Sequence, residues 1–275
     1  MSRFFFTHRF LILRRISQIT LLVLLIGANR WGWKIITGNL TFSELFEKIP
    51  LTDPFALLQV FAAGASVKQT VAVGALIVAL FYVFLGGRSF CSWICPVNLV
   101  TDAAGGIRRG LKMDFEDEDG FIRLSRNVRY WMIGISLILS MLLGVAAFEF
   151  ISPVSMMHRG LIFGIGFGWM AVGMIFLFDL LAVRNGWCGH LCPLGGFYSL
   201  IGRNRLIQVR HTADLCSRCD RCIAVCPEKE ILSEVGKQSG TISHGECVLC
   251  GRCVEVCEEN ALRFGIRKIL KRRKT

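Results

Sequence analysis

Four long apolar segments, separated by more polar connections, dominate the first two thirds of the chain. They cover residues 16–37, 69–87, 130–148 and 160–183. A helix needs about 20 consecutive apolar residues to cross the hydrocarbon core of a membrane. The pattern therefore predicts four transmembrane helices. The uncharged part of the first segment ends at Asn29, so we expect Arg30–Lys34 to form its interfacial end.

The second and fourth segments belong to an internal repeat. In the first copy, Pro54–Gln59 precedes the second segment and the motif Cys91-Ser-Trp-Ile-Cys95-Pro96. In the second copy, Pro153–His158 precedes the fourth segment and the motif Cys188-Gly-His-Leu-Cys192-Pro193. The first proline and the first cysteine are 37 residues apart in one copy and 35 in the other. Two copies that run in the same direction predict a parallel pseudo-twofold axis along the membrane normal.

The basic residues predict how these segments lie in a membrane. With both termini in the cytoplasm, 27 of the 32 Lys and Arg residues lie inside and 5 outside. This is the bias expected of cytoplasmic loops. The net charge of +12 does not indicate a nucleic-acid partner, because the basic residues lie at the ends of apolar segments and in a tail. With 53% hydrophobic residues, the chain is predicted to be a multi-pass membrane protein with cytoplasmic termini.

The C-terminal third contains two runs of closely spaced cysteines. Their spacing, C-x2-C-x2-C-x3-C, is that of bacterial ferredoxins, where three cysteines of one run bind one [4Fe-4S] cubane and the fourth binds the other. The motif therefore predicts two clusters. The expected ligands are Cys216, Cys219, Cys222 and Cys257 for the first cluster, and Cys226, Cys247, Cys250 and Cys253 for the second.

A zinc site and a disulfide framework agree less well with these eight cysteines. Zinc needs only four ligands and has no use for a third cysteine in each triplet. All twelve cysteines of the chain fall inside motifs, which suits thiols that are kept reduced on the cytoplasmic side of a membrane. The segment has little core of its own, so we expect cluster binding to stabilise its fold.

The two Cys-x3-Cys-Pro motifs each follow an apolar segment. The repeat would bring four thiols together near the inner membrane interface: those of Cys91, Cys95, Cys188 and Cys192. A proline after the second cysteine is typical of the first turn of a helix, where backbone N–H groups favour an anion and lower a thiol pKa. Three interpretations are open: ligation of a further cluster or metal ion, redox chemistry of the thiols, and packing of small residues at helix ends.

One histidine is a further candidate. His158 corresponds to Gln59 in the repeat and is predicted on the outer side, where it could take a proton from a quinol or serve simply as an interfacial residue. The sequence has no histidine pair for a b-type haem, no C-x-x-C-H haem motif and no nucleotide-binding glycine motif. This leaves one-electron iron–sulfur chemistry beside a lipid phase, where a quinone is the available redox partner.

The ordered set of four apolar segments, two Cys-x3-Cys-Pro motifs and two ferredoxin runs resembles the NapH-type membrane ferredoxin subunits of periplasmic nitrate reductase systems. The resemblance covers the whole chain. It implies a quinol dehydrogenase subunit of the bacterial inner membrane, not a stand-alone enzyme. Such a subunit takes electrons from menaquinol or ubiquinol and passes them, with a periplasmic ferredoxin-type partner, toward the nitrate reductase. The resemblance also implies that the four Cys-x3-Cys-Pro cysteines belong to this electron route.

Together these features predict an all-α integral membrane domain of four helices with an internal parallel repeat, followed by a small α+β domain of the bacterial 2[4Fe-4S] ferredoxin type. The membrane domain is expected over residues 1–207, the cytoplasmic ferredoxin domain over 208–268 and a basic tail over 269–275. A second hypothesis is a non-catalytic protein for redox sensing or metal-centre assembly. In that case the Cys-x3-Cys-Pro thiols handle a metal and the clusters report the redox state.

Overall fold

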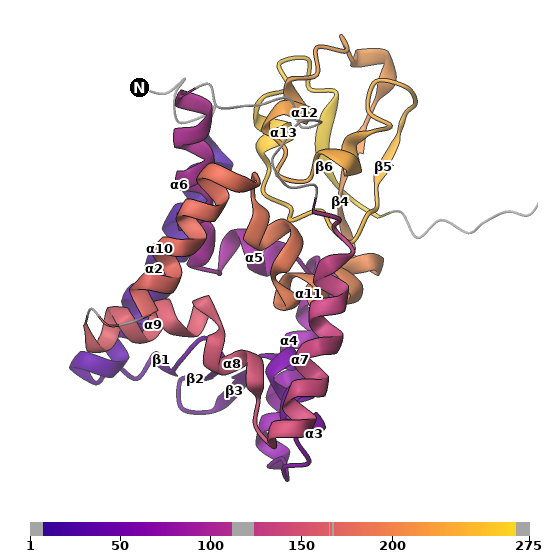
Figure 1. The fold of residues 1–275 in the computed structure, drawn as a ribbon. Helices are drawn as coiled ribbons and strands as arrows, with labels where there is room; N and C mark the ends of the chain where they lie inside the picture. Colours follow the sequence, from indigo (N-terminus) through magenta and orange to yellow (C-terminus); the bar gives the residue numbers. More distant parts are fainter. Residues whose placement is uncertain (1–7, 112–123, 165, 167, 268–275) are drawn as a thin grey trace, which may run out of the picture.

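The computed structural model describes residues 8–111, 124–164, 166 and 168–267 (Figure 1). The basic tail predicted at 269–275 lies outside these residues. The α-helices, labelled as in Figure 1, are α2 (Arg9–Trp31), α3 (Pro54–Ala62), α4 (Gln69–Leu85), α5 (Ser89–Trp93), α6 (Val97–Gly110), α7 (Val128–Leu143), α8 (Ala147–Ile151), α9 (Pro153–Phe163), α10 (Gly168–Leu177), α11 (Pro193–Ile201), α12 (Arg221–Val225) and α13 (Arg252–Glu255). The strands are β1 (Ile36–Gly38), β2 (Phe42–Leu45), β3 (Ile49–Thr52), β4 (Ile207–His211), β5 (Gly240–Ile242) and β6 (Leu262–Ile266). Two π-helical segments, Phe178–Ala182 and Trp187–Leu191, and three short 3-10 helices, Gly202–Asn204, Ala213–Leu215 and Lys229–Leu232, complete the regular structure of the described residues.

Helix α2 is long and apolar enough to cross a membrane, and it is the one such helix in the described part of the chain. It has 23 residues and ends at Gly32, whose left-handed backbone (φ 70°) lets its N–H bond to the carbonyl of Ala28. The other apolar helices are shorter. Helix α4 has 17 residues and α7 has 16. Helix α10 continues into a π-helical segment, and the two together, Gly168–Ala182, have 15 residues.

The prediction of an all-α domain with four transmembrane helices is therefore wrong. At 1.5 Å per residue, a 17-residue helix reaches only about 26 Å, against a hydrocarbon core of about 30 Å. Within the third predicted segment, α7 stops before Gly144 (φ 68°), and the fourth predicted segment is interrupted at Gly164 (φ 100°), where α9 ends. Positive φ is readily adopted by glycine and terminates a helix.

A three-stranded antiparallel sheet also contradicts the all-α prediction. Strands β1, β2 and β3 follow one another along the chain and pair in the same order, with Leu45 opposite both Ile36 and Ile49. The end of the first predicted apolar segment thus becomes β1 instead of helix. Gly74 of α4 lies so close to Pro50 of β3 that a Cβ there would be 3.0 Å from the Pro50 carbonyl oxygen. The sheet is therefore packed directly on α4.

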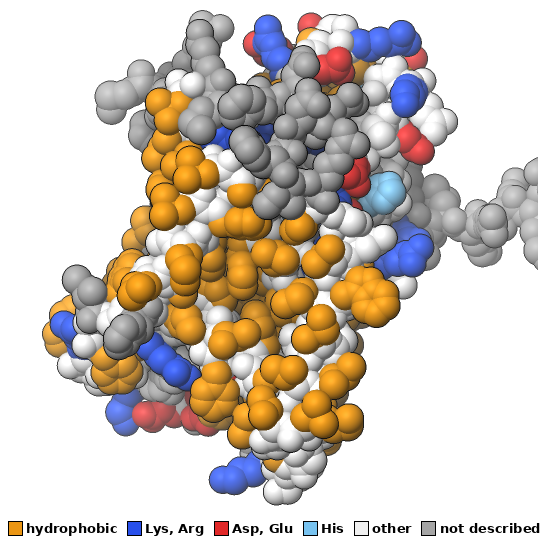
Figure 2. Space-filling view, in the orientation of Figure 1, with side chains coloured by type: hydrophobic (Ala, Val, Ile, Leu, Met, Phe, Trp, Pro, Cys, Tyr) orange, Lys and Arg blue, Asp and Glu red, His pale blue; other side chains and the backbone are white. Residues whose placement is uncertain are grey.

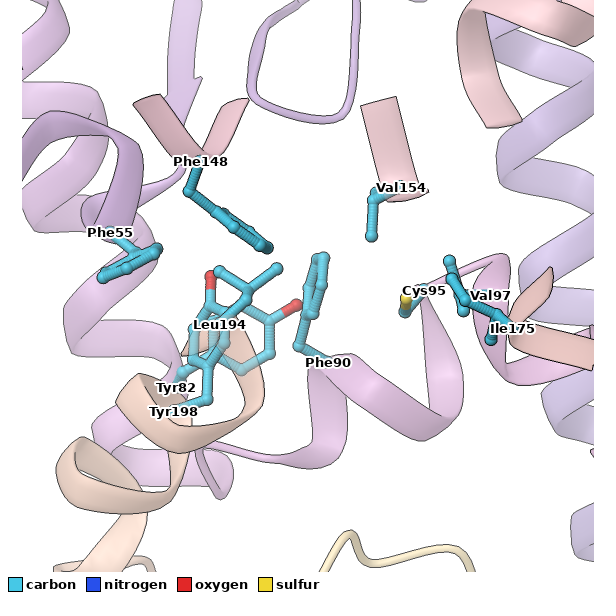
Figure 3. Packing of buried hydrophobic residues seen from close by; sticks show 10 residues of the cluster. All are labelled: Phe55, Tyr82, Phe90, Cys95, Val97, Phe148, Val154, Ile175, Leu194 and Tyr198. Atoms are coloured by element: carbon cyan, nitrogen blue, oxygen red, sulfur yellow. The ribbon is translucent and has the colours of Figure 1, made fainter. Parts of the chain in front are cut away.

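The helices α4 and α5 of the first repeat copy meet α11 of the second in a core of aromatic residues (Figure 3). Tyr82 of α4 and Tyr198 of α11 lie edge to face, with ring centroids 5.0 Å apart, and Phe90 of α5 stacks on Tyr198 at 5.1 Å. Gly87 permits this approach, because a Cβ on it would lie 1.8 Å from the Tyr198 carbonyl oxygen. The segments that carry the two Cys-x3-Cys-Pro motifs are thus held against each other.

The C-terminal part has the α+β arrangement that the sequence predicts. Strand β4 is paired with β5 on one side and β6 on the other, all antiparallel. Its core contains Val209, Leu232 and Leu262. This part lies at one end of the helical part, near the start of α2 (Figure 1). Phe10 of α2 packs edge to face on Phe264 of β6 with centroids 5.1 Å apart.

The outer surface of the helical part is apolar. Large exposed side chains cover α2, α4, α7 and α10, for example Leu76 (59% exposed), Leu142 (73%) and Met170 (63%). In Figure 2 hydrophobic side chains spread over this region, while charged side chains gather on the C-terminal part and at the opposite end. Exposed apolar patches of this extent mark contact with lipid or with another protein.

Candidate functional site

The first cysteine run folds around a cavity of about 140 Å³. Four cysteines line this cavity: Cys216, Cys219, Cys222 and Cys257. The loop before α12 bends around it because Arg218 (φ 56°) and Asp220 (φ 54°) adopt the left-handed conformation. Positive φ is uncommon for residues other than glycine, so this loop has a specific and constrained shape.

The second run folds in the same way around a smaller cavity of about 20 Å³. Its lining includes the other four cysteines: Cys226, Cys247, Cys250 and Cys253. Leu249 (φ 51°) and Gly251 (φ 77°) stand at the positions that Arg218 and Asp220 occupy in the first loop. The two runs therefore share one backbone conformation at equivalent positions.

Each cavity gathers three cysteines of one run and the fourth cysteine of the other. This grouping is the one expected for two cubanes. Within the described residues, no three His, Cys, Asp or Glu side chains are placed to hold a single metal ion. The thiolates of a cubane bind different iron atoms and stand farther apart than the ligands of one ion. Four thiols that converge on each cavity fit an iron–sulfur cluster, which would supply one-electron transfer.

The four Cys-x3-Cys-Pro thiols lie at the edge of the aromatic core. Cys91 belongs to α5, Cys188 belongs to the π-helical segment Trp187–Leu191, and Cys192 caps α11. Cys95 is 7% exposed and belongs to the core, and the other three cysteines are partly buried and pack against the same core. They are near enough that the charge of Cys91 or Cys192 acts on the pKa of Cys95 and Cys188. The structure thus brings together the cysteines of both repeats.

The thiol pKa values differ from the sequence-based expectation. The N–H of Gly195 donates to Cys192 Sγ at 3.4 Å, as expected for a residue at a helix start, but burial outweighs this bond and raises the Cys192 pKa to about 12. Burial likewise raises the pKa of Cys95 and Cys188. At α6 the cap is Pro96, not Cys95. The N–H groups at the helix starts do act to lower the pKa of Cys95 and Cys192, as predicted, but burial outweighs them, so the expected net lowering does not occur.

The Cys-x3-Cys-Pro site touches the second ferredoxin loop. Ser92 Oγ donates to the carbonyl of Val248 at 2.6 Å, and Trp93 Nε1 donates to the carbonyl of Leu249 at 3.1 Å. A small cavity of about 30 Å³ is lined from both sides, with Cys91 and Cys188 on one side and Cys250 on the other. The site and the second cysteine cavity are thus direct neighbours.

A buried ion-pair network surrounds this contact. Glu228, 2% exposed, pairs with Arg88 (2.5 Å), Arg126 (2.6 Å) and Arg129 (3.5 Å). Arg129 also pairs with Glu246. Burial acts to raise the Glu228 pKa, but the arginines, led by Arg88, hold that pKa below its usual range. Sequence analysis missed this network, although Arg88 and Glu228 stand close to cysteine motifs in the chain.

A second network joins α2, α6 and α13. Asp102 is contacted by Arg15 at 2.5 Å, by Arg14 at 3.6 Å and by Arg252. Burial acts to raise the Asp102 pKa, and the three arginines, led by Arg252, lower it. Arg252 lies between the ligand candidates Cys250 and Cys253, so this network also fixes the second ferredoxin loop to the helical part.

His158 lies apart from this contact. It belongs to α9 and is 3% exposed, and its Nε2 has no hydrogen-bond partner among the described residues. Burial and the neighbouring Arg159 lower its pKa, which favours the neutral ring. Gln59, its counterpart in the repeat, is also buried and accepts a hydrogen bond from the N–H of Phe148 at 2.9 Å. The quinol role of His158 stays a prediction.

Comparison with protein families agrees with both kinds of cysteine site. The 4Fe-4S dicluster domain family matches residues 208–258. The 4Fe-4S binding domain family matches twice, over residues 67–113 and 165–210. Each of these two matches contains one Cys-x3-Cys-Pro motif. The chain therefore carries iron–sulfur domains, and one family covers both copies of the repeat.

Individual relatives extend over most of the chain. The ferredoxin-type protein NapH of Escherichia coli is 40% identical over 82% of this chain and 77% of its own length. The methylamine utilization ferredoxin-type protein MauN of Paracoccus denitrificans is 41% identical over 87% and 84%, and that of Methylorubrum extorquens is 39% identical over 85% and 80%. No solved structure matches the chain.

These relatives confirm the resemblance to NapH, and the apolar α2 together with the apolar outer surface favours association with a membrane. The cysteine cavities and the matched iron–sulfur domains agree on electron transfer as the chemistry. The chain therefore belongs to the NapH-type family of ferredoxin-type iron–sulfur electron-transfer proteins.

Proposed function

We propose that this protein oxidises quinol at the membrane and passes the electrons through its iron–sulfur centres toward a periplasmic nitrate reductase, with a periplasmic ferredoxin-type partner. Menaquinol or ubiquinol is the donor. The chain acts as one subunit of this system. Its C-terminal part, residues 208–268, is a ferredoxin domain on the cytoplasmic side.

In this proposal the eight ferredoxin cysteines bind two [4Fe-4S] clusters. Cys216, Cys219, Cys222 and Cys257 hold the first, and Cys226, Cys247, Cys250 and Cys253 hold the second. The division of these cysteines between two cavities supports this assignment. A third cluster at Cys91, Cys95, Cys188 and Cys192 is supported by their proximity and by the double match to a 4Fe-4S binding domain family.

The observation that carries the proposal is the small cavity between the two kinds of site. Because Cys91, Cys188 and Cys250 line the same cavity, redox centres held by the two sites would be neighbours with little protein between them. Arg88 connects the two parts of the molecule as well. It donates to the carbonyl of Cys188 in the helical part (2.9 Å) and to that of Glu246 in the ferredoxin part (3.0 Å). This arrangement supports electron exchange between the helical part and the ferredoxin domain.

The names of the relatives point to two different redox systems, one for nitrate and one for methylamine. Proteins named for methylamine utilization are as similar to this chain as those named NapH. Deletion of the gene in its own host distinguishes the two systems. Loss of nitrate-dependent growth supports the nitrate reductase assignment. A mutant that still grows with nitrate but no longer grows on methylamine contradicts it.

Replacing Cys188 with serine tests the role of the Cys-x3-Cys-Pro site. We expect the Cys188→Ser protein to lose about four iron atoms per chain, because one cubane ligand is removed. We also expect quinol to fail to reduce the remaining clusters, while dithionite still reduces them. Iron analysis and EPR spectroscopy of the anaerobically purified protein measure both effects. His190→Gln, which alters the same π-helical segment without removing a thiol, is the matched control.

Unchanged iron content together with unchanged reduction by quinol in Cys188→Ser would contradict the relay role. The cysteines would then be packing residues of the helix ends.

A further inference from the structure

A cavity in the apolar half of the molecule has no cysteine among the described residues that line it. It measures about 290 Å³ and lies between α2, the β1–β3 sheet and α4. Its walls are apolar, with Leu25, Val78 and Ile94 among them. Ile77 and Phe81 also line it and are 39% and 54% exposed, so the cavity opens onto the apolar surface. A ligand that enters here comes from an apolar phase.

Four polar side chains line this cavity at its sheet side: Asn39, Ser43, Thr52 and Asp53. Asp53 is half-buried and caps α3, and its Oδ1 accepts hydrogen bonds from the N–H of Phe55 (3.2 Å) and the hydroxyl of Tyr198 (3.2 Å). An apolar cavity with a few convergent polar groups is the usual form of a small-molecule site.

The far side of the cavity leads to the Cys-x3-Cys-Pro site. Phe90 and Ile94 line the cavity and belong to the turn that carries Cys91 and Cys95. Phe90 stacks on Tyr198 with the ring planes 20° apart (Figure 3). Tyr198, which donates a hydrogen bond to Asp53, therefore contacts α5, the helix that carries Cys91. A redox-active ring in this cavity would lie beside the proposed electron relay.

We propose that this cavity binds the ring of the quinol, with a ring hydroxyl donating a hydrogen bond to the carboxylate of Asp53. This inference rests on the proposed oxidation of quinol. A quinol ring has the properties that the cavity requires, because it is flat and apolar, carries hydroxyl groups at its ends and reaches the protein from the lipid. Asp53, not His158, is then the residue that meets the quinol hydroxyl.

The charge state of Asp53 adds a pH dependence. Burial raises its pKa to about 7, with the carboxylate of Glu149 as the next cause. Tyr198 and Tyr82 are the other titratable groups near it. Burial and the Asp53 charge raise the pKa of Tyr198, so Tyr198 keeps its proton and donates. Above pH 7 the Asp53 carboxylate accepts from a quinol hydroxyl, and below pH 7 the protonated carboxyl donates to a quinone carbonyl.

Anaerobic calorimetric titration with menadiol and menadione tests this site without measuring turnover. We expect Asp53→Asn to weaken menadiol binding about ten- to hundredfold, because the charged carboxylate that accepts the hydrogen bond is replaced by a neutral amide. Asparagine is as good a helix cap as aspartate, so α3 is preserved. Val78→Trp fills the cavity and should abolish binding. Leu76→Trp, on the exposed face of the same helix, is the matched control and should bind normally.

The pH profiles sharpen the test. Menadiol binding should weaken as the pH falls through about 7, menadione binding should weaken as it rises, and Asp53→Asn should remove both trends. Glu149→Gln should move both midpoints to lower pH, because it removes a negative charge beside Asp53. Unaltered binding in Val78→Trp and Asp53→Asn would overturn the site. If quinol still reduces the clusters of the wild type in that case, the proposed function stands and only its location is wrong. Absence of binding to the wild-type protein overturns the site as well.

Discussion

Combining Cys226→Ser with Cys247→Ser should remove no more iron than either change alone, about four atoms per chain. Both cysteines line the second cavity, so both changes remove ligands from one cluster. Combining Cys222→Ser with Cys226→Ser should instead remove about eight atoms, because these two residues line different cavities although they are only four positions apart. Iron analysis of protein purified without oxygen measures both results.

Ser217→Ala is the control for this experiment, because it changes the same loop without removing a thiol. The opposite pattern would contradict the assignment. If the Cys222 and Cys226 changes together cost only one cluster, each run binds its own cluster and the exchange of the fourth cysteine does not occur.

Replacing Glu228 with glutamine should destabilise the contact between the ferredoxin domain and the helical part. Glu228 is the shared partner of Arg88 and Arg129, which are 2% and 0% exposed. Removing one partner of a buried ion pair costs about 3–5 kcal/mol, because the remaining charges stay buried without compensation. The midpoint of thermal unfolding should fall by about 10 °C.

Glu230 offers a matched control two residues away. It pairs with Arg126 at 3.3 Å but is 74% exposed, so Glu230→Gln should change the free energy of unfolding by less than about 1 kcal/mol. Equal stability of the two variants would show that the buried network does not hold the domains together. Limited proteolysis between residues 200 and 210 reports separately whether the ferredoxin domain is released.

The cysteine motifs were the most informative part of the sequence. Ferredoxin spacing reflects the geometry of a cubane, so local sequence alone indicated which four cysteines would share a cavity. The repeat likewise indicated that Cys91 and Cys188 would come together. The shape of each ferredoxin loop is set locally, as at Arg218 and Leu249. The grouping of distant cysteines was predictable because the two runs and the two repeat copies each have the same pattern.

Helix lengths were harder to predict, because hydropathy does not show where the backbone turns. Gly144 and Gly164 end helices inside apolar segments, and Ile36 continues an apolar segment as a strand. Long-range pairs were also beyond the sequence. The pairing of Arg88 with Glu228 spans 140 residues, and Asp53 meets Tyr198 across 145. Burial of the Cys-x3-Cys-Pro thiols, which depends on the whole fold, also raises their pKa values above the expected range.

The most direct test of the account is to add menadiol to the anaerobically purified wild-type protein and record the EPR spectrum of its iron–sulfur clusters. A sample reduced with dithionite defines full reduction. We expect menadiol alone to produce a cluster signal in the wild type and Cys188→Ser to abolish that signal. A protein whose clusters respond to dithionite but never to menadiol would contradict the proposed oxidation of quinol.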